Sequence, residues 1–257
     1  MIINQIEDRI GSFTGDIGIY YMDLTTNECC FVGNKDVFPA SGMVKLMTLI
    51  EAHNQIFNKT LSKDDVYTLR LEDFVRDEVS YGAIDSLHPG IDLTIADIYR
   101  LSISVSDNIA FNILLGKLGM TTVNETFRQL GYKNMIINRS LFDNEKIKKG
   151  IENYISIKEM GKIMQRLYMG QIISKKSSQD ILDCLSKHQR NNIIPYHFSE
   201  DTYIAHLSAY DEGLILDSGI VFADNPFLLS MGAFQGDTRK AEGIMRDITL
   251  LCYNNSN

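Results

Sequence analysis

The chain has no tryptophan, only four prolines and four cysteines, and no excess of positive charge. Its 25 Lys and Arg residues are outnumbered by 33 Asp and Glu residues, which gives a formal net charge of −8 at pH 7. Nucleic-acid binding relies on surplus cations that displace phosphate counterions, so this balance argues against a nucleic-acid partner. The basic cluster at residues 146–149 is interpreted as a solvated face.

Long hydrophobic runs are also absent. Acidic residues appear within the first ten positions, and no apolar run is long enough for a signal peptide or a membrane span. We therefore expect a cytoplasmic protein, or a secreted one from which a leader has been trimmed. Neither the cysteines nor the five histidines have metal-ligand spacing, so we expect no metal and no cofactor.

The order of secondary-structure patterns predicts a sheet assembled from both ends of the chain around a helical middle. The apolar fraction of 44% is ordinary for a globular core, and no repeat or Pro/Gly-rich linker divides the chain. β-Rich runs cover residues 16–24, 29–32, 202–208, 214–222 and 227–233. Helical repeats cover residues 2–11, 43–57, 94–118, 156–169, 177–185 and 237–252.

Three segments carry motifs. A Pro-Gly and Leu-Thr stretch at residues 87–94 leads into Ser106-Asp107-Asn108, residues 38–46 place Lys45 near the start of a helix, and residues 205–209 read Ala-His-Leu-Ser-Ala. In this order and at these separations they resemble the motif set of the class A β-lactamases and their penicillin-recognising relatives, serine hydrolases that act on cyclic amides. The resemblance covers essentially the whole chain.

The resemblance implies an α/β (α+β) fold of the β-lactamase/transpeptidase type. We expect residues 1–42 and 191–257 to form an antiparallel sheet lobe with flanking terminal helices. Residues 43–190 should form an all-α lobe packed closely on it, with the site between the two. The resemblance also implies a β-lactam or a D-alanyl-peptide-like ligand, and the oligomeric state is left open.

Two departures bear on the chemistry. The family places its nucleophilic serine three residues before the motif lysine, so that hydroxyl and amine share one helical face. Here that position holds Gly42, and Ser41 lies one place too early. The family's strand motif Lys-Thr-Gly is replaced by Leu207-Ser208-Ala209, which removes a second cation, keeps a hydroxyl and adds a methyl group.

Other site residues follow from the resemblance. The backbone amides of Gly42 and Tyr210 correspond to the two oxyanion donors, and these survive a change of side chain. Asp143 and Glu145 are candidates for a deacylating carboxylate. Tyr81 either lines the rim of the cleft or is an ordinary loop aromatic. Lys45, Ser106 and Asn108 either retain a ligand-binding role or only hold the two lobes together.

Three hypotheses on activity remain. The chain is a natural pseudoenzyme, or a working β-lactamase or D-Ala-D-Ala-type hydrolase whose serine was deliberately replaced at position 42, or an enzyme that uses Ser41. The second departure, at Leu207, favours the first hypothesis, because a deliberate change would target position 42 alone. A shift by one residue turns a side chain by roughly 100° around a helix, which weighs against Ser41.

Overall fold

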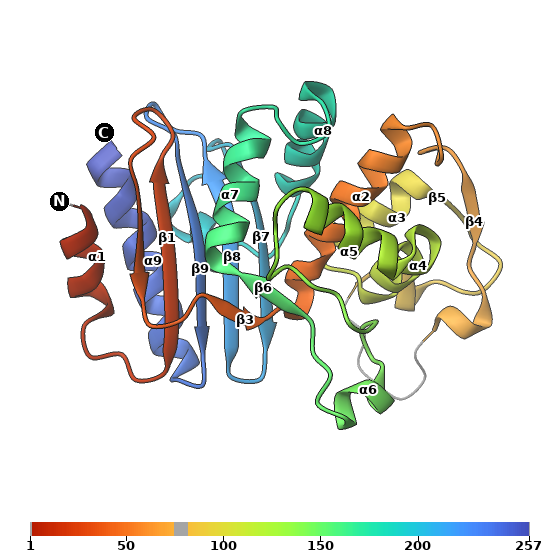
Figure 1. Ribbon diagram of the computed structural model, residues 1–257, viewed down its shortest axis with the longest axis horizontal. Helices are drawn as coiled ribbons and strands as arrows, with labels where there is room; N and C mark the ends of the chain where they lie inside the picture. Colours follow the sequence, from red (N-terminus) through yellow and green to blue (C-terminus); the bar gives the residue numbers. More distant parts are fainter. Residues whose placement is uncertain (1, 75–81, 257) are drawn as a thin grey trace.

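The main sheet joins the two ends of the chain, as the sequence predicts. The computed structural model describes residues 2–74 and 82–256. Within them, an antiparallel five-stranded sheet has the order β2-β1-β9-β8-β7 (Figure 1). The amino-terminal hairpin therefore pairs with the last strand, with Ile19 opposite Met231. The strands are β1 (Asp16–Asp23), β2 (Cys29–Gly33), β7 (Ile204–Asp211), β8 (Leu214–Val221) and β9 (Phe227–Phe234).

Helices cover both faces of this sheet. The terminal helices α1 (Ile2–Ile10) and α9 (Thr238–Ser256) pack together on one face, and α7 (Ile157–Tyr168) crosses the other (Figure 1). The sheet alternates accordingly, because successive side chains of a strand point to opposite faces. Ile17, Ile19 and Tyr21 enter the core beneath α1 and α9, whereas Tyr20 and Met22 enter the core beneath α7.

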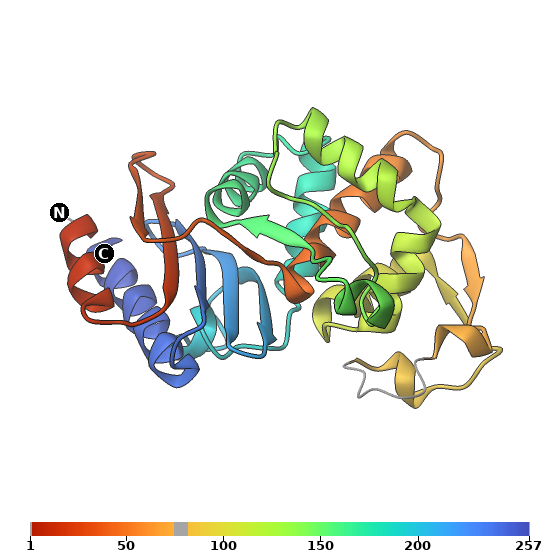
Figure 2. The ribbon, with the colours of Figure 1, turned by 60° about the horizontal axis from the view of Figure 1, so that its bottom comes forward.

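The core beneath α7 continues into the helical lobe. Figure 2 shows α2, in orange, running from the edge of the sheet into that lobe. The lobe's elements are a 3₁₀ turn η1 (Ser41–Val44), α2 (Lys45–Phe57), α3 (Ile95–Ser104), α4 (Asn108–Leu118), α5 (Met120–Gln129), α6 (Asn144–Lys148) and α8 (Lys175–Leu185), with short 3₁₀ turns η2 (Leu71–Asp73) and η3 (Ile84–Ser86). A further 3₁₀ turn, η4 (Ile194–His197), packs instead against α9 and β8 of the sheet lobe. Two small sheets pair β3 (Val37–Pro39) with β6 (Tyr154–Ser156) and β4 (Val66–Thr68) with β5 (Asp92–Thr94). The expected division of the chain at residues 42 and 190 stays a prediction, and α7 contacts the sheet although it falls within 43–190.

The single long helix expected within residues 94–118 is wrong. The structure has two helices, α3 and α4, separated by a corner at Val105-Ser106-Asp107. Ser106 has a φ of 56°, which an α-helix does not tolerate. Asp107 then begins the second helix, because its carboxylate accepts the amide hydrogen of Ala110 at 2.8 Å. Apolar periodicity continues through the corner and conceals it in the sequence.

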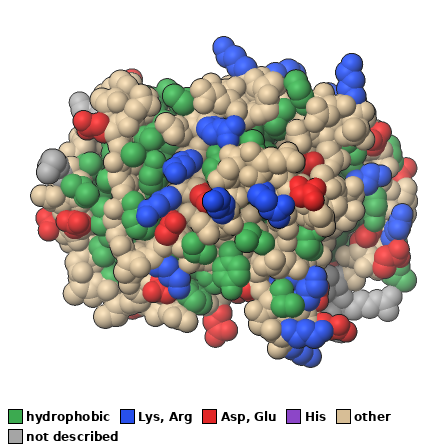
Figure 3. Space-filling model, in the orientation of Figure 1, with side chains coloured by type: hydrophobic (Ala, Val, Ile, Leu, Met, Phe, Trp, Pro, Cys, Tyr) green, Lys and Arg blue, Asp and Glu red, His purple; other side chains and the backbone are tan. Residues whose placement is uncertain are grey.

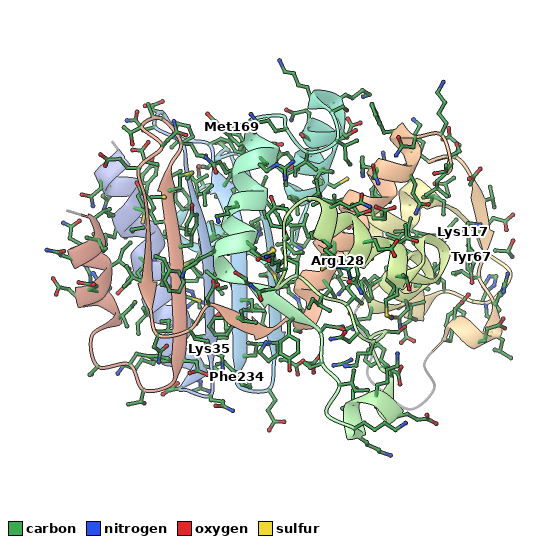
Figure 4. All side chains as sticks on the ribbon, in the orientation of Figure 1. Lys35, Tyr67, Lys117, Arg128, Met169 and Phe234 are labelled. Atoms are coloured by element: carbon green, nitrogen blue, oxygen red, sulfur yellow. The ribbon has the colours of Figure 1, made fainter. Side chains whose placement is uncertain are left out.

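The surface shows no gathering of positive charge on the face that carries α7. Lys and Arg side chains are interspersed there with Asp and Glu (Figure 3). Lys35 lies beside Phe234 at one end of the sheet (Figure 4), with its Nζ 5.4 Å from the ring centroid. Among the residues that the structure describes, no helix is both long and apolar enough to span a membrane.

A glycine sets the distance between α7 and the sheet, and this gives a first prediction. A Cβ at Gly161 would overlap the ring of Tyr20, whereas a Cβ at Gly243, in α9, would meet nothing within 4 Å. We expect Gly161→Ala to lower the free energy of unfolding by about 1–3 kcal/mol, through overpacking. Gly243→Ala should raise it by about 0.5–1 kcal/mol, because glycine weakens a helix. Urea unfolding of both variants checks this, and equal effects would contradict the packing described.

Candidate active site

The first wall of the site is the start of α2. Ser41 and Gly42 open the 3₁₀ turn η1, which runs without a break into the helix that begins at Lys45. Position 42 and Lys45 therefore lie one turn apart on the same side. The side chain of Lys45 is only 1% exposed, so its amine must find all its hydrogen-bond partners within the protein.

The corner between α3 and α4 supplies those partners. Lys45 Nζ lies 2.7 Å from the carbonyl oxygen of Ser106, 2.8 Å from Ser106 Oγ and 2.7 Å from Asn108 Oδ1. The left-handed conformation of Ser106 lets its carbonyl and hydroxyl oxygens reach the same amine. Strained backbone of this kind persists where the surroundings fix it, and it gathers at functional sites.

A buried carboxylate holds this corner in place. Asp107 is fully buried, and its Oδ2 accepts the amide hydrogens of Ala83 at 2.7 Å and Ile84 at 2.8 Å. Gly82 has a φ of 134°, and a Cβ there would overlap the Asp107 carboxylate. The loop before η3 and the corner at Ser106 are thus fixed against each other by one side chain.

Burial and, to a smaller extent, the nearby positive charge of Arg190 lower the pKa of Lys45 to about 7, although the Asp107 carboxylate acts in the opposite direction. The hydrogen bonds are compatible with a neutral amine. A neutral amine has two N–H groups, which can donate to two of these three oxygens, and a lone pair that can accept a proton. Near neutral pH, Lys45 can therefore act as a proton acceptor.

Gly42 leaves a space that a side chain would fill. A Cβ built on Gly42 lies 3.5 Å from each of three atoms: Lys45 Nζ, Ser106 Oγ and Ala209 Cβ. These are ordinary van der Waals distances, and the backbone of Gly42 does not have a positive φ. A small side chain at position 42 would point at the amine and hydroxyl without strain.

The second wall is β7, an edge strand of the sheet. The Ser208 amide donates to His188 Nε2 at 3.2 Å, so this residue's backbone faces away from β8. In an antiparallel ladder this direction alternates, so the backbone N–H and C=O of Tyr210 face the same free edge. The Tyr210 carbonyl accordingly accepts the Ser41 hydroxyl at 3.2 Å. The Tyr210 amide therefore faces η1, where Gly42 lies.

A neutral histidine links the two walls. His188 Nδ1 lies 2.7 Å from the carbonyl oxygen of Ile103, three residues before Ser106, while Nε2 accepts from the Ser208 amide. Nδ1 must therefore carry the hydrogen. Burial and the neighbouring His206 lower the pKa of His188 to about 3, which keeps the ring neutral. Ser208, which the sequence predicted to be a site residue, has its hydroxyl oxygen 3.0 Å from His188 Nε2.

The structure brings most of the sequence-predicted residues together. One pocket of about 50 Å³ is lined by Ser41, Gly42, Lys45, Ser106, Asn108, Arg190, Ala209 and Tyr210. Sequence reasoning missed Arg190, which lies in an irregular segment where no motif marks it. Leu207 is fully buried in the apolar core and does not line the pocket. Tyr81 lies outside the described residues.

The two candidate carboxylates lie elsewhere. Asp143 caps α6, accepting the amide hydrogen of Lys146 at 3.1 Å, and Glu145 is in the first turn of that helix. Neither lines the pocket around Gly42. Within residues 2–74 and 82–256, no group of three or more His, Cys, Asp or Glu side chains is placed to hold a metal ion.

Comparisons with known proteins agree with this architecture. The model of the beta-lactamase enzyme family matches residues 1–256, so the chain belongs to that family. A β-lactamase of Phocaeicola vulgatus is 23% identical over 237 residues, covering 88% of this chain and 71% of that protein. The sequence-based expectation of the family is thereby confirmed.

Solved structures show the same fold. A β-lactamase from Chitinophaga pinensis is similar with a TM-score of 0.88 and 20% identity, covering 100% of this chain and 99% of that one. A variant of PBP-A, in an acyl-enzyme complex with penicillin G, has a TM-score of 0.85 and 22% identity, covering 99% of this chain and 95% of that one. The expected fold, an antiparallel sheet lobe with an all-α lobe, is confirmed.

The lowered pKa of Lys45 predicts a pH dependence of stability. The unfolded lysine keeps its proton up to about 10.5, whereas the folded one releases it near 7. Between these values unfolding takes up a proton, so the free energy of unfolding should rise with pH from about 7 toward 10. Lys45→Met should lack this rise, because methionine does not titrate.

The measurement is urea unfolding of both proteins between pH 6 and 10, with the difference taken at each pH. Lys117→Met, which removes an exposed lysine of the helical lobe (Figure 4), controls for the loss of one charge. If the free energies of unfolding of the unaltered chain and of Lys45→Met changed in parallel with pH, folding would not lower the pKa of Lys45.

Proposed function

We propose that this chain is a non-hydrolysing member of its family, in which the cleft is kept for binding a β-lactam-like or D-alanyl-peptide-like ligand. The observation that carries the proposal is the space at Gly42. A Cβ there lies 3.5 Å from both Lys45 Nζ and Ser106 Oγ, although the nucleophile's side chain is missing.

The proposal follows the expected roles atom by atom. In a serine hydrolase, the hydroxyl attacks a carbonyl carbon after a base accepts its proton, and backbone amides stabilise the oxyanion. In the proposed roles, a neutral Lys45 would be the base, and the amides of Gly42 and Tyr210 would be the donors. With no hydroxyl at position 42 the first step cannot occur. Loss of a catalytic nucleophile typically costs about 10⁶-fold in kcat.

Ser41 is a poor substitute for that nucleophile. It lines the same pocket, but its hydroxyl donates to the Tyr210 carbonyl, and its oxygen is not among the three hydrogen-bond partners of Lys45. The hydrogen bond to Tyr210 directs the Ser41 side chain toward β7. No base activates it in this geometry.

The pocket also lacks a group for deacylation. None of the described residues that line it carries a carboxylate, and the one acid nearby, Asp107, accepts backbone amide hydrogens with both oxygens. An ester formed at position 42 would have no carboxylate among the described lining residues to activate water as a general base. This supports a binding role over the alternative, a working hydrolase whose serine alone was replaced.

Restoring the hydroxyl tests the proposal. We expect Gly42→Ser to gain the mass of one penicillin G molecule on incubation, because the new hydroxyl would lie beside Lys45 Nζ. The unaltered chain and Gly42→Ala should gain none, since alanine fills the same space without a hydroxyl. Intact-protein mass spectrometry distinguishes these outcomes. An adduct on the unaltered chain that disappears in Ser41→Ala would instead identify Ser41 as the nucleophile.

The lifetime of that adduct gives a further prediction. Because none of the described lining residues carries a carboxylate, the acyl group on Gly42→Ser should persist after excess penicillin is removed. Mass spectra recorded over hours would follow its loss, and general-base catalysis is worth about 10²–10⁴-fold in rate. Turnover of penicillin within seconds would show that a base from outside the described lining reaches the ester, and would favour the alternative of a replaced serine.

A further inference from the structure

The pocket around Gly42 carries positive charge in a chain that is acidic overall. Its described lining contains the guanidinium of Arg190, the amine of Lys45 with its lowered pKa, and no carboxylate. The formal net charge of the whole chain is −8. A small, partly desolvated pocket concentrates the field of its own charges, so this pocket favours an anionic group over a neutral one.

Arg190 is presented by a segment that is fixed at several points. The amide of Gln189 donates to the Ser104 carbonyl at 2.9 Å, and the Arg190 carbonyl accepts the Ser208 hydroxyl at 3.3 Å. The guanidinium carbon lies 5.9 Å from the centre of the Tyr210 ring. Arg190 and Tyr210 thus lie together in the lining of the pocket. The half-buried Arg190 is also close enough to Lys45 for its charge to lower the pKa of that lysine.

Residues 207–209 of β7 include no cationic side chain. Leu207 and Ala209 share one face of β7, and Leu207 is buried with the apolar side chains packed beneath α7. Ser208 faces the opposite way, toward His188. Among the described lining residues, a ligand in the pocket would therefore meet a cation from α2 or from the segment between α8 and η4.

We propose that Arg190 binds the carboxylate of an anionic ligand in this pocket, and so replaces from a different segment the cation that Leu207 removes from the strand. The inference rests on the proposed function, because it places the ligand's carbonyl between the Gly42 and Tyr210 amides. The planar guanidinium can bond both oxygens of a carboxylate, which lysine cannot. Arg190 is thus a specificity-determining residue for carboxylate-bearing ligands.

The test measures the Kd of penicillin G and of its methyl ester for the unaltered chain by calorimetry, without any covalent step. Arg190→Gln should raise the Kd of penicillin G about 10- to 100-fold, the usual effect of losing a charge-assisted pair. The ester should bind the unaltered chain about as weakly as penicillin G binds Arg190→Gln. Arg190→Lys should give an intermediate Kd, because it keeps the charge but not the two-fold geometry.

Arg100 provides a matched control. Its guanidinium also lies 5.9 Å from a tyrosine ring, that of Tyr99, but it lines a different cavity. Arg100→Gln should leave the Kd of penicillin G unchanged within about two-fold, a shift of a few tenths of a kcal/mol. If Arg190→Gln fails to fold, the comparison of acid and ester on the unaltered chain still decides the question.

The outcomes separate the two proposals. Equal Kd values for acid and ester, or for the unaltered chain and Arg190→Gln, would overturn the role of Arg190 and leave the binding pocket intact. Absence of binding by the unaltered chain at millimolar ligand would instead overturn the proposed binding function, and the role of Arg190 with it. The adduct on Gly42→Ser would then show by itself whether the acylation geometry survives.

Discussion

The burial of one amine, that of Lys45, is the constraint on which the rest of the site depends. An amine that is 1% exposed must be surrounded by acceptors, and three oxygens from Ser106 and Asn108 surround it. Those oxygens reach it only because Ser106 adopts a left-handed conformation. That conformation ends α3, and Asp107 then starts α4. The break between two helices is therefore a consequence of satisfying a single nitrogen.

The opposite wall depends on the edge of β7 remaining unpaired. Because no further strand pairs with that edge within the described chain, the Ser208 amide can bond His188, and Tyr210 can face η1. His188 carries the connection onward to the carbonyl of Ile103, just before the Ser106 corner. Both walls are thus held by hydrogen bonds that do not involve the side chain at position 42. The geometry of both walls therefore does not depend on which side chain stands at position 42.

Much of this arrangement could be predicted from the sequence. The alternation of apolar residues predicts the five strands, and the spacing of the motifs brings Gly42, Lys45, Ser106 and Asn108 to one pocket. The corner at Ser106 could not be predicted from periodicity, because apolar residues continue through it at helical spacing. The sequence signal for this corner was the pair Ser106-Asp107, because aspartate is a common N-cap of helices.

Other features depend on the path of irregular segments. The position of Arg190 is fixed by contacts of the stretch between α8 and η4 with Ser104 and Ser208, which are distant in the sequence. No repeat or motif marks those contacts. The side-chain direction of Ser208, by contrast, follows from strand alternation relative to Ala209. Counting along β7 would have placed the Ser208 hydroxyl away from the pocket.

The most direct test of the central claim is a crystal structure of the Gly42→Ser variant soaked with penicillin G. The account predicts an ester bond between the new hydroxyl oxygen and the opened lactam. Its carbonyl oxygen should lie within hydrogen-bonding distance of the amides at positions 42 and 210, and its carboxylate should face Arg190. An ordered hydroxyl at position 42 with no adduct, or an adduct attached to Ser41, would contradict the claim that the acylation geometry has been preserved without its nucleophile.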